Sequence, residues 1–409
     1  MRLSNNLMYQ NNLTSILDNQ SEVNKAMQQV NTQKRVLSAS DDPSATARAI
    51  LYADRIQTNE QYDKNLTMLN SRLDTQESVL KNIKTSLEQA YTLAIRAGNG
   101  SVTDVDKDSI AQEIKSIQEA VLDMMNAKSE DGRYIFSGYQ DNTQTYSQDS
   151  SSGKFVYNGD QGQHKIKVAE GVEIRSSDNG FDVFEKAQSR LNVTSNTATP
   201  GAPVTGAKVY VTEQGEFDKF HQTHYNADPT AAATANDFTV TLGAGNTYTL
   251  TQNGSPVQSG TYTDNKINVG GMEISFSGGP TGTVDFSLAA PKKDNVLNTL
   301  EDLYKGLMTP GTSEKDTEQL IADAIVGIDN AKNQISYSQA SLGGRKNTAK
   351  QISSANADLD INNKAAKADI LELDMTEAIT ALKKHETALQ ASQATYGRLS
   401  NLSLFDYIR

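Results

Sequence analysis

Apolar residues near the start of the chain recur at alternating steps of three and four positions, with polar residues between them. This spacing places them on one stripe of a helix and is typical of a coiled coil. The stripe is Leu13, Ile16, Val23, Met27, Val30 and Leu37, with Tyr9, Gln20 and Lys34 in nearly the same register. The pattern therefore predicts that the N-terminal helix packs along another helix.

A stop and a restart follow at residues 38–49. Asp41 or Asp42 can cap a helix, and Pro43 suits a first helical turn. A long helix is expected from about residue 44 to 97, where the sequence GNG ends it. Its stripe is Tyr62, Leu66, Leu69, Leu73, Gln76, Leu80, Ile83, Leu87, Ala90 and Ala94. A third helix is expected to start at TDVDKDS, residues 103–109, with the stripe Ile110, Ile114, Ile117, Val121 and Met124.

The period changes in the middle of the chain. From about residue 136 to 293, apolar and polar residues alternate around turns that contain Gly and Asp, which predicts antiparallel hairpins. The sequence PGAPVTG at 200–206 is typical of a linker between two β modules.

The helical pattern returns at Asp294. A short amphipathic helix is expected first, and a long helical region follows from about residue 313, with a break or kink at LGGRKNT, residues 342–348. The last stripe is Leu371, Met375, Ala378, Leu382, Leu389, Tyr396 and Leu399, with His385 and Ser392 as polar members and Phe405 in the apolar tail that follows.

Similar stripes at the two ends predict an α+β fold. We expect an elongated helical hairpin, or coiled-coil bundle, formed by both chain ends, with an inserted antiparallel β head. The expected segments are 1–42 pairing with 364–409, 43–135 pairing with 294–363, a first β module at 136–190 and a second, variable β module at 191–293. We call the apolar members of the two terminal stripes, with Phe405, the assembly seam.

The assembly seam is marginal by itself. Ordering each residue costs about 1–2 kcal/mol of backbone entropy, and a buried Leu contributes about 1.5–3 kcal/mol. Only about two residues in seven face the seam, so the gain from burial barely offsets the cost of ordering the helices. Polar members such as Gln20, Lys34, His385 and Ser392 weaken it further. We therefore expect the chain ends to be stabilised mainly when several chains pack together.

Composition excludes several classes of function. The net charge of −12 argues against general binding of nucleic acid and against docking on anionic lipid. The chain has no Cys, so disulfides and thiolate metal sites are impossible. No apolar run approaches the roughly 18 residues of a membrane helix, and the N-terminus lacks the apolar core of a secretory signal. Membrane insertion is therefore not expected.

Candidate catalytic and metal sites are weak. His385 begins a zinc-peptidase-like triplet, but Leu389 stands where the second His is needed. His221 and His224 lack a carboxylate cluster and are expected in a surface loop. The acids at 104–109 lack the Gly and Glu of a calcium loop and favour a helix N-terminus instead. We expect no enzyme activity, cofactor or metal.

Four stretches resemble the bacterial flagellin superfamily. They are MRLSNNLMYQNNL at the N-terminus, RVLSASDDPSATARA at 35–49, DGRYIFSGYQDNT at 131–143 and LSNLSLFDYIR at 399–409. The loop motif Asp41-Asp42-Pro43 resembles members at the hook–filament junction more than filament flagellin. The resemblance covers roughly residues 1–190 and 294–409.

This resemblance implies a structural role in the bacterial flagellum, outside the cell. It implies a homo-oligomeric ring that contacts the first hook-associated protein on the hook side and flagellin on the filament side. It also implies flagellar type III export without a cleaved signal, aided by a chaperone that binds the C-terminal segment. The implied chaperone-binding residues are Leu371, Leu382, Leu389 and Leu399. The alternatives are filament flagellin itself, or an adhesin or binding role for the β head.

Overall fold

The protein is described by a computed structural model that defines the backbone of residues 2–407 and the side chains of residues 7–398. The chain forms two compact units. Unit 1 comprises Met1–Thr67, Lys167–Val172 and Ala349–Arg409, and unit 2 comprises Met68–Ile166 and Glu173–Thr348. The predicted α+β class, with an antiparallel β region inserted between helical ends, is confirmed.

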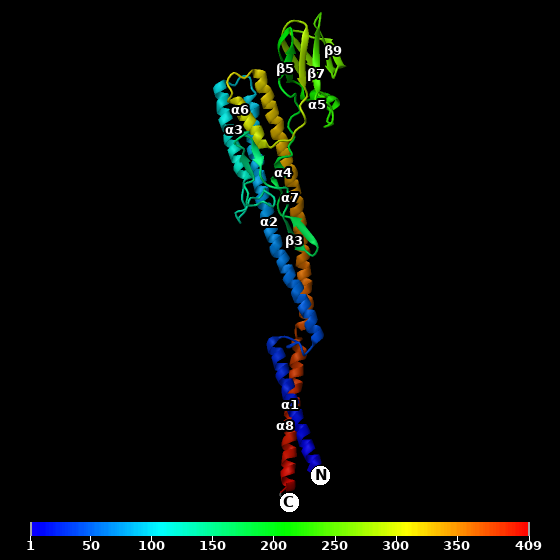
Figure 1. The fold of residues 1–409 in the computed structure, drawn as a ribbon. Coiled ribbons are helices and arrows are strands. Elements are labelled where there is room, and N and C mark those ends of the chain that lie inside the picture. Colours follow the sequence, from blue (N-terminus) through cyan, green and yellow to red (C-terminus); the bar gives the residue numbers. More distant parts are fainter. Residues whose placement is uncertain (1, 408–409) are drawn as a thin grey trace. The chain divides into compact units, whose positions relative to one another are not determined.

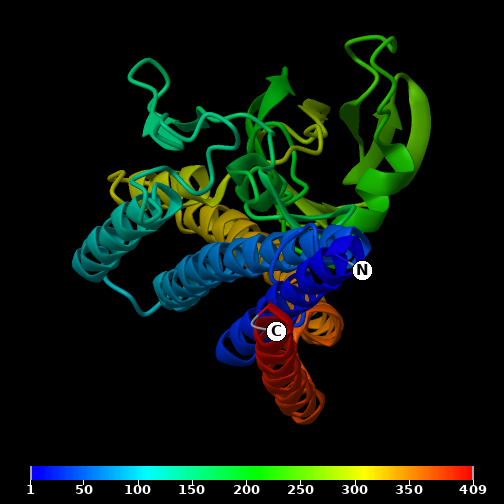
Figure 2. The ribbon, with the colours of Figure 1, turned by 90° about the horizontal axis from the view of Figure 1, so that it is seen from below.

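Unit 1 contains the two terminal helices. Helix α1 (Arg2–Thr32) lies antiparallel to α8 (Met375–Tyr407), and the two run side by side in Figures 1 and 2. The first part of α2 (Pro43–Ala97) and the last part of α7 (Glu314–Leu371) also belong to unit 1.

Unit 2 holds the rest of α2 and α7, with α3 (Asp104–Met125) and α6 (Val296–Leu307). The predicted stripe of the second helix is buried throughout, so that prediction is confirmed. On α3 the prediction of the last stripe residue was wrong, because Met125 rather than Met124 is fully buried. A straight helix drifts from a strict seven-residue repeat, and a second four-residue step restores the register.

The β region of unit 2 is dominated by one antiparallel sheet of eight strands, in the order β10-β11-β6-β5-β12-β7-β8-β9. Its elements are β5 (Thr197–Gly201), β6 (Val204–Val211), α5 (Gln214–His224), β7 (Asp237–Gly243), β8 (Thr247–Gln252), β9 (Ser255–Thr261), β10 (Lys266–Val269), β11 (Met272–Gly278) and β12 (Gly282–Ser287). Inward residues such as Val209, Phe238 and Leu250 fill one core, against which Phe217 of α5 also packs.

Smaller elements precede this sheet. They are β1 (Tyr146–Gln148), β2 (Phe155–Tyr157), β3 (Lys165–Ala169), β4 (Val172–Arg175) and α4 (Gly180–Phe184). Strand β1 pairs with β2, and β3 pairs with β4.

Three sequence-based predictions were wrong. Residues 200–206 are not a linker, because they end β5, turn and begin β6, where Val204 and Ala207 are buried in the sheet core. Residues 214–224 form helix α5 rather than a loop, and His221 is buried on it. The helix does not break at 342–348, because Leu342 and Arg345 are buried there and hold α7 in place.

The C-terminal stripe is interrupted rather than continuous. Helix α7 ends at Leu371 and α8 begins at Met375. The break has a local cause: the Asp374 Oδ1 accepts the N–H groups of Thr376, at 2.8 Å, and Glu377, at 3.2 Å, which caps a new helix. At the other end of the chain, α1 ends at Thr32, so Lys34 and Leu37 of its predicted stripe lie outside the helix.

Candidate assembly surface

The terminal helices α1 and α8 meet through side chains from both predicted stripes. The rings of Tyr9 and Tyr396 lie 5.0 Å apart between centroids, and their hydroxyl groups are hydrogen-bonded. The Asn19 Nδ2 donates to the Ser392 Oγ at 2.9 Å. Such polar contacts are expected where the interface between α1 and α8 remains partly accessible to water.

Few members of the assembly seam are fully covered within one chain. Ala378 is buried, and the seam members that are partly buried are Ile16, Val23, Val30, Leu37, Leu371, Leu382, Leu389 and Tyr396. Leu13, Met27 and Met375 are exposed. Leu37 lies between α1 and α2, and Leu371 ends α7, so neither belongs to the α1–α8 helix pair. Leu399 and Phe405 lie outside the residues whose side chains the structure describes.

One edge of the α1 stripe is left uncovered by α8. Tyr9, Leu13, Leu17 and Met27 share one side of α1 by helical spacing, and each is between 43% and 58% exposed. On α8, Met375 and Ile379 are exposed one turn apart. We call these six residues the exposed apolar edge.

Several large apolar side chains left exposed on two packed helices are typical of a surface that binds another protein. Covering the remaining half of one large side chain contributes about 1 kcal/mol. The exposed apolar edge is therefore our candidate for the surface on which further helices pack.

The loop motif Asp41-Asp42-Pro43 organises the entry to α2. The Asp42 Oδ1 accepts the N–H of Ala45 at 2.9 Å, which makes Asp42 the N-cap of a helix that begins at Pro43. The Asp41 Oδ2 accepts the N–H of Ser38 at 3.0 Å and that of Leu37 at 3.2 Å. The two aspartates therefore have different tasks, one capping the helix and one closing the loop.

An ion pair fastens the same loop to α1. The Lys25 Nζ lies 3.0 Å from the Asp41 Oδ1. The hydrogen bond from Lys25, followed by that from the Ser38 N–H, holds the pKa of Asp41 below its ordinary value.

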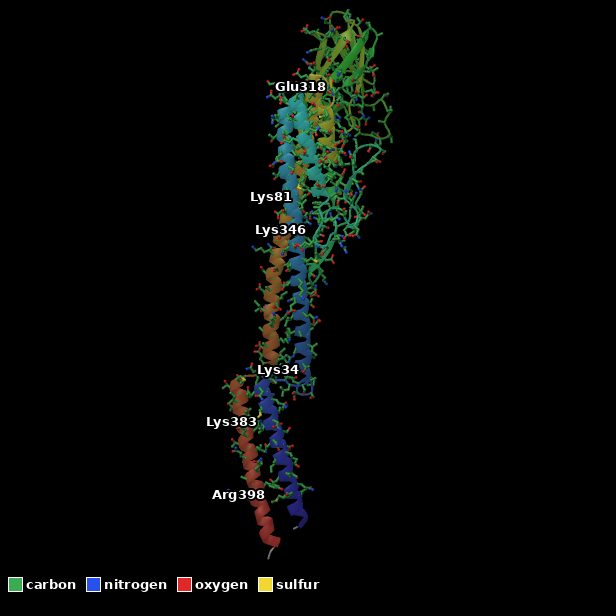
Figure 3. The ribbon with its side chains drawn as sticks, turned by 90° about the vertical axis from the view of Figure 1, so that its left-hand side faces the viewer. Lys34, Lys81, Glu318, Lys346, Lys383 and Arg398 are labelled. Carbon is green, nitrogen blue, oxygen red and sulfur yellow. The ribbon has the colours of Figure 1, made fainter. Side chains whose placement is uncertain are left out.

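The loop after α1 also caps the end of α7. The Arg35 N–H donates to the carbonyl of Leu371 at 2.8 Å, and its guanidinium donates to the carbonyl of Ile370 at 2.8 Å and 3.3 Å. Lys34 forms an antiparallel bridge with Glu372. The breaks after α1 and before α8 therefore lie opposite each other, and Figure 3 labels Lys34 at this place.

Sequence reasoning missed two members of this surface. Leu17 lies four residues after Leu13, and this spacing would have placed it beside the predicted stripe. Arg35 carries no such signal, because its acceptors belong to residues more than 300 positions later.

The histidines and the acidic segment that were candidates for a catalytic or metal site have structural roles instead. The His221 Nε2 is hydrogen-bonded to the Ala289 carbonyl at 2.8 Å, and His385 is partly buried on α8. Thr103 and Asp106 form a capping box at the start of α3, which accounts for the acids there. Among residues 7–398, no three His, Asp or Glu are grouped to hold a metal ion.

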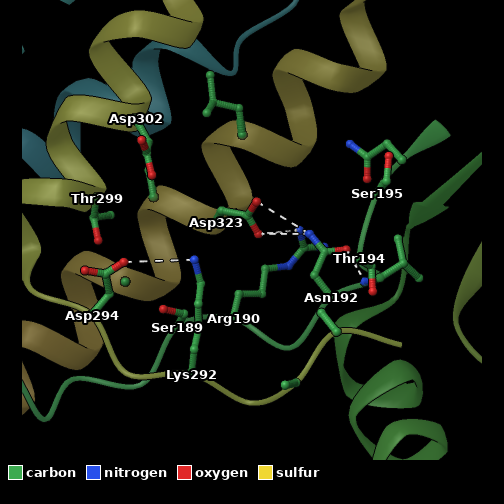
Figure 4. A pocket seen from close by; sticks show the side chains of 17 residues that line it. Ser189, Arg190, Asn192, Thr194, Ser195, Lys292, Asp294, Thr299, Asp302 and Asp323 are labelled. Atoms are coloured by element: carbon green, nitrogen blue, oxygen red, sulfur yellow. Dashed lines mark hydrogen bonds and ion pairs between the residues drawn. The ribbon is translucent and has the colours of Figure 1, made fainter. Parts of the chain in front are cut away.

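Unit 2 also contains a cavity of about 700 Å³ (Figure 4). It lies among loops 189–196 and 289–294 and the helices α6 and α7. The buried Arg190 donates to the Asp323 Oδ1 at 3.1 Å, and Asn192 donates to the same carboxylate at 3.3 Å. The charges of Arg190 and Asp323 are paired with each other. We therefore interpret the cavity as a packing gap where the loops that lead to the sheet meet α6 and α7.

The described helices include none that is both long enough and apolar enough to span a bilayer. Two family models match the ends of the chain. The bacterial flagellin N-terminal helical region matches residues 3–141, and the bacterial flagellin C-terminal helical region matches residues 325–408. Together these matches cover more than half of the chain.

Similarity to individual proteins extends over the middle of the chain as well. Flagellar hook-associated protein 3 of Escherichia coli K12 is 23% identical over 409 residues, which covers 99% of each chain. The protein of the same name from Salmonella typhimurium is 22% identical over 100% of each chain. The crystal structure of the flagellar junction protein FlgL from Legionella pneumophila superimposes with a TM-score of 0.58 at 26% identity, covering 80% of this chain and 100% of that one.

Proposed function

This chain belongs to the bacterial flagellin family, and we propose that it is a structural subunit of the hook–filament junction of a bacterial flagellum. The exposed apolar edge of the terminal helix pair is the observation that carries the proposal. A subunit that acted alone would leave these side chains in water, whereas a subunit in a helical lattice buries them against its neighbours. Similarity over the full length to hook-associated proteins favours the junction over the filament.

In this proposal the assembly seam is completed by copies of the same chain arranged in a ring. The first hook-associated protein borders the ring on one side and flagellin borders it on the other. The sheet β5–β12 carries none of the exposed apolar edge, so it takes no part in this packing.

Export is proposed to follow the flagellar type III route, so the protein acts outside the cell. Before export, a chaperone covers the C-terminal segment through Leu371, Leu382, Leu389 and Leu399. The reason is physical, because large apolar side chains left exposed in the cytoplasm promote aggregation. A binding assay of the full chain with the chaperone, with and without the substitutions Leu382→Asp and Leu389→Asp, tests this assignment.

The central test is complementation in a flagellated host that lacks its own copy of this gene. The intact chain should restore filaments on hooks. Leu13→Asp with Leu17→Asp should not, because each carboxylate would have to be buried unpaired when the lattice forms, at a cost of several kcal/mol. The matched control is Asn11→Asp with Ser15→Asp, since these positions on α1 are exposed, polar and also four residues apart, and helical spacing places them on the side of α1 opposite Leu13 and Leu17.

Two outcomes would reject the proposal. Restored filaments with the Leu13 and Leu17 variant would show that the exposed apolar edge is not an assembly surface. Restoration of filaments in a strain that lacks flagellin, by polymerisation of this chain, would identify it as filament flagellin instead. Attachment of the purified chain to cells or glycans would be needed before the β region could be called an adhesin.

A further inference from the structure

Helix α7 contains two adjacent glycines near its middle, Gly343 and Gly344. A Cβ atom at either position would meet no atom within 4 Å, so packing within the chain does not require glycine. Each glycine lowers the helix-forming equilibrium constant about fivefold relative to alanine. The pair is therefore a weak point of a 58-residue helix, and its weakness has no explanation in close packing.

Two basic side chains pin the helix immediately after this weak point. Arg345 forms an ion pair with Asp178, and the side chains are 10% and 9% exposed. The Arg345 Nη1 also donates to the carbonyl of Arg175 at 3.2 Å, and the Gln76 Nε2 donates to the Asp178 Oδ2 at 3.1 Å. One buried carboxylate therefore joins α7, α2 and the loop before α4.

Lys346 adds a second attachment to α2. Its ammonium group is paired with Asp74 and lies 2.5 Å from the Glu77 Oε2. The hydrogen bonds with Asp74 and Glu77 raise the pKa of Lys346. Figure 3 labels Lys346 on α7, and its partners belong to α2 of the same unit. On the other side of the glycines, Leu342 is fully buried.

We propose that Gly343 and Gly344 form a bending point of α7, which the pairs made by Arg345 and Lys346 hold straight. Sharp helix kinks occur at Gly pairs, among a few other causes. With the ion pairs closed, the helix is continuous, as observed. With them open, only the packing of Leu342 and Ala349 offsets the low helix propensity of the glycines, and the turn that contains the glycines opens more often. This bending point is separate from the proposed function, which concerns the surface of α1 and α8.

Hydrogen exchange of the full chain, followed by mass spectrometry, tests whether the helix opens at Gly343 and Gly344. The amides at 343–350 lie in the glycine turn and the turn that follows it, and their exchange reports the opening of this segment. Arg345→Met with Asp178→Asn removes the buried pair without leaving a lone charge. We expect exchange at 343–350 to become at least about tenfold faster, since hydrogen bonds to charged groups contribute that much or more. Exchange at 328–338 should not change.

The glycines are tested by rescue in the same background. Adding Gly343→Ala and Gly344→Ala should slow the accelerated exchange by about 25-fold, which is the product of two fivefold effects. Unchanged exchange after removal of the pair would overturn the proposal. Acceleration that the two alanines do not reduce would overturn it as well, because the weak point would then not be the glycines.

The matched control is another interhelical ion pair of unit 2, between Lys115 of α3 and Glu301 of α6, with 3.1 Å between the charged atoms. Helix α3 contains no glycine. Lys115→Met with Glu301→Gln should accelerate exchange at 115–122 by much less than the α7 variant accelerates exchange at 343–350, because α3 has no glycine at which the helix opens easily. Opening as large as that in α7 would show that loss of any ion pair suffices, and would reject the role of the glycines.

A milder variant covers the case in which the buried pair is needed for folding. Lys346→Met removes only the partly exposed attachment. It should accelerate exchange at 343–350 about threefold, in line with a modest surface pair, and the two alanines should reverse this change. Wild-type exchange in this variant would contradict the proposal independently.

Discussion

The guanidinium of Arg35 donates through Nη2 to the main-chain carbonyl of Ile370 at 2.8 Å, across 335 positions of sequence. Helix C-termini leave carbonyl groups without partners, and a cation there is favourable both as a donor and against the helix dipole. The end of α7 is therefore closed by a residue from the other end of the chain. The same contact brings the exit of α1 to the entry of α8, so it sets the register in which the terminal helices pair.

Arg35→Ala should loosen this connection. The variant leaves the Ile370 carbonyl without its side-chain donors, at a cost of about 1 kcal/mol for a partly exposed hydrogen bond. Hydrogen exchange should accelerate at the end of α7 and the start of α8, with little change in the sheet of unit 2. Arg48→Ala is the control, since Arg48 is an exposed arginine on α2. Equal effects of the two variants would show that Arg35 acts only through its charge.

The pH dependence of unit 1 should contain a contribution from Asp41. Its pKa is lowered in the folded chain by Lys25 and by the loop N–H groups. A carboxyl whose folded pKa is depressed stabilises the fold above its unfolded pKa and loses that contribution as the pH falls through the folded value. Thermal midpoints of wild type and Asp41→Asn should therefore differ at pH 6 and converge as the pH falls below about 4. A difference that stays constant over this range would exclude the ionised form as the cause.

The helices were predictable because they bury long regular stripes. Leu80, Ile83 and Leu87 are fully buried at the positions that the spacing requires, and Asp42 caps the helix that its sequence context predicted. Local rules suffice where one face of a helix meets a continuous core.

The less predictable features depend on distant partners. The break between Leu371 and Met375 has a local cap in Asp374, but Arg35, which closes the end of α7 at this break, lies far away in the sequence and carries no local signal. The turn at Gly201 resembled a linker, because Gly and Pro mark both linkers and hairpins, and only the pairing of β5 with β6 separates them. The uncovered edge around Leu17 needed the position of α8, which the heptad pattern alone does not give.

Gln319 should be an anchor between the sheet and α7. Its Nε2 donates to the Val211 carbonyl at 3.0 Å and its Oε1 accepts the Val211 N–H at 3.3 Å, so one carboxamide replaces a strand partner at the end of β6. Gln319→Leu leaves the buried Val211 N–H without its acceptor, although Arg190 still donates to the Val211 carbonyl at 3.0 Å, and should destabilise unit 2 by about 2 kcal/mol. Chemical denaturation measures the change. Its neighbour Glu318 is exposed and labelled in Figure 3, and Glu318→Leu should stay within about 0.5 kcal/mol of wild type.

The terminal helix α8 permits a test that separates assembly from folding. Leu382 and Leu389 lie one heptad apart on the seam side of α8, and both are partly buried. Leu382→Asp with Leu389→Asp should leave the melting of unit 2 unchanged, because that unit has its own core and contains neither residue. In the assembled junction each carboxylate would be buried without a partner, at several kcal/mol per site, and the cost recurs in every subunit.

Cells with this variant should therefore carry hooks without filaments and release flagellin into the medium. Thr380→Asp with Thr387→Asp is the control, since these α8 positions are exposed and also seven residues apart. The control should assemble normally, because its carboxylates stay in water. Motile cells with the leucine variant would show that the pairing of α8 is not part of the assembly surface, and the exposed leucines of α1 would then have to meet their partners without it.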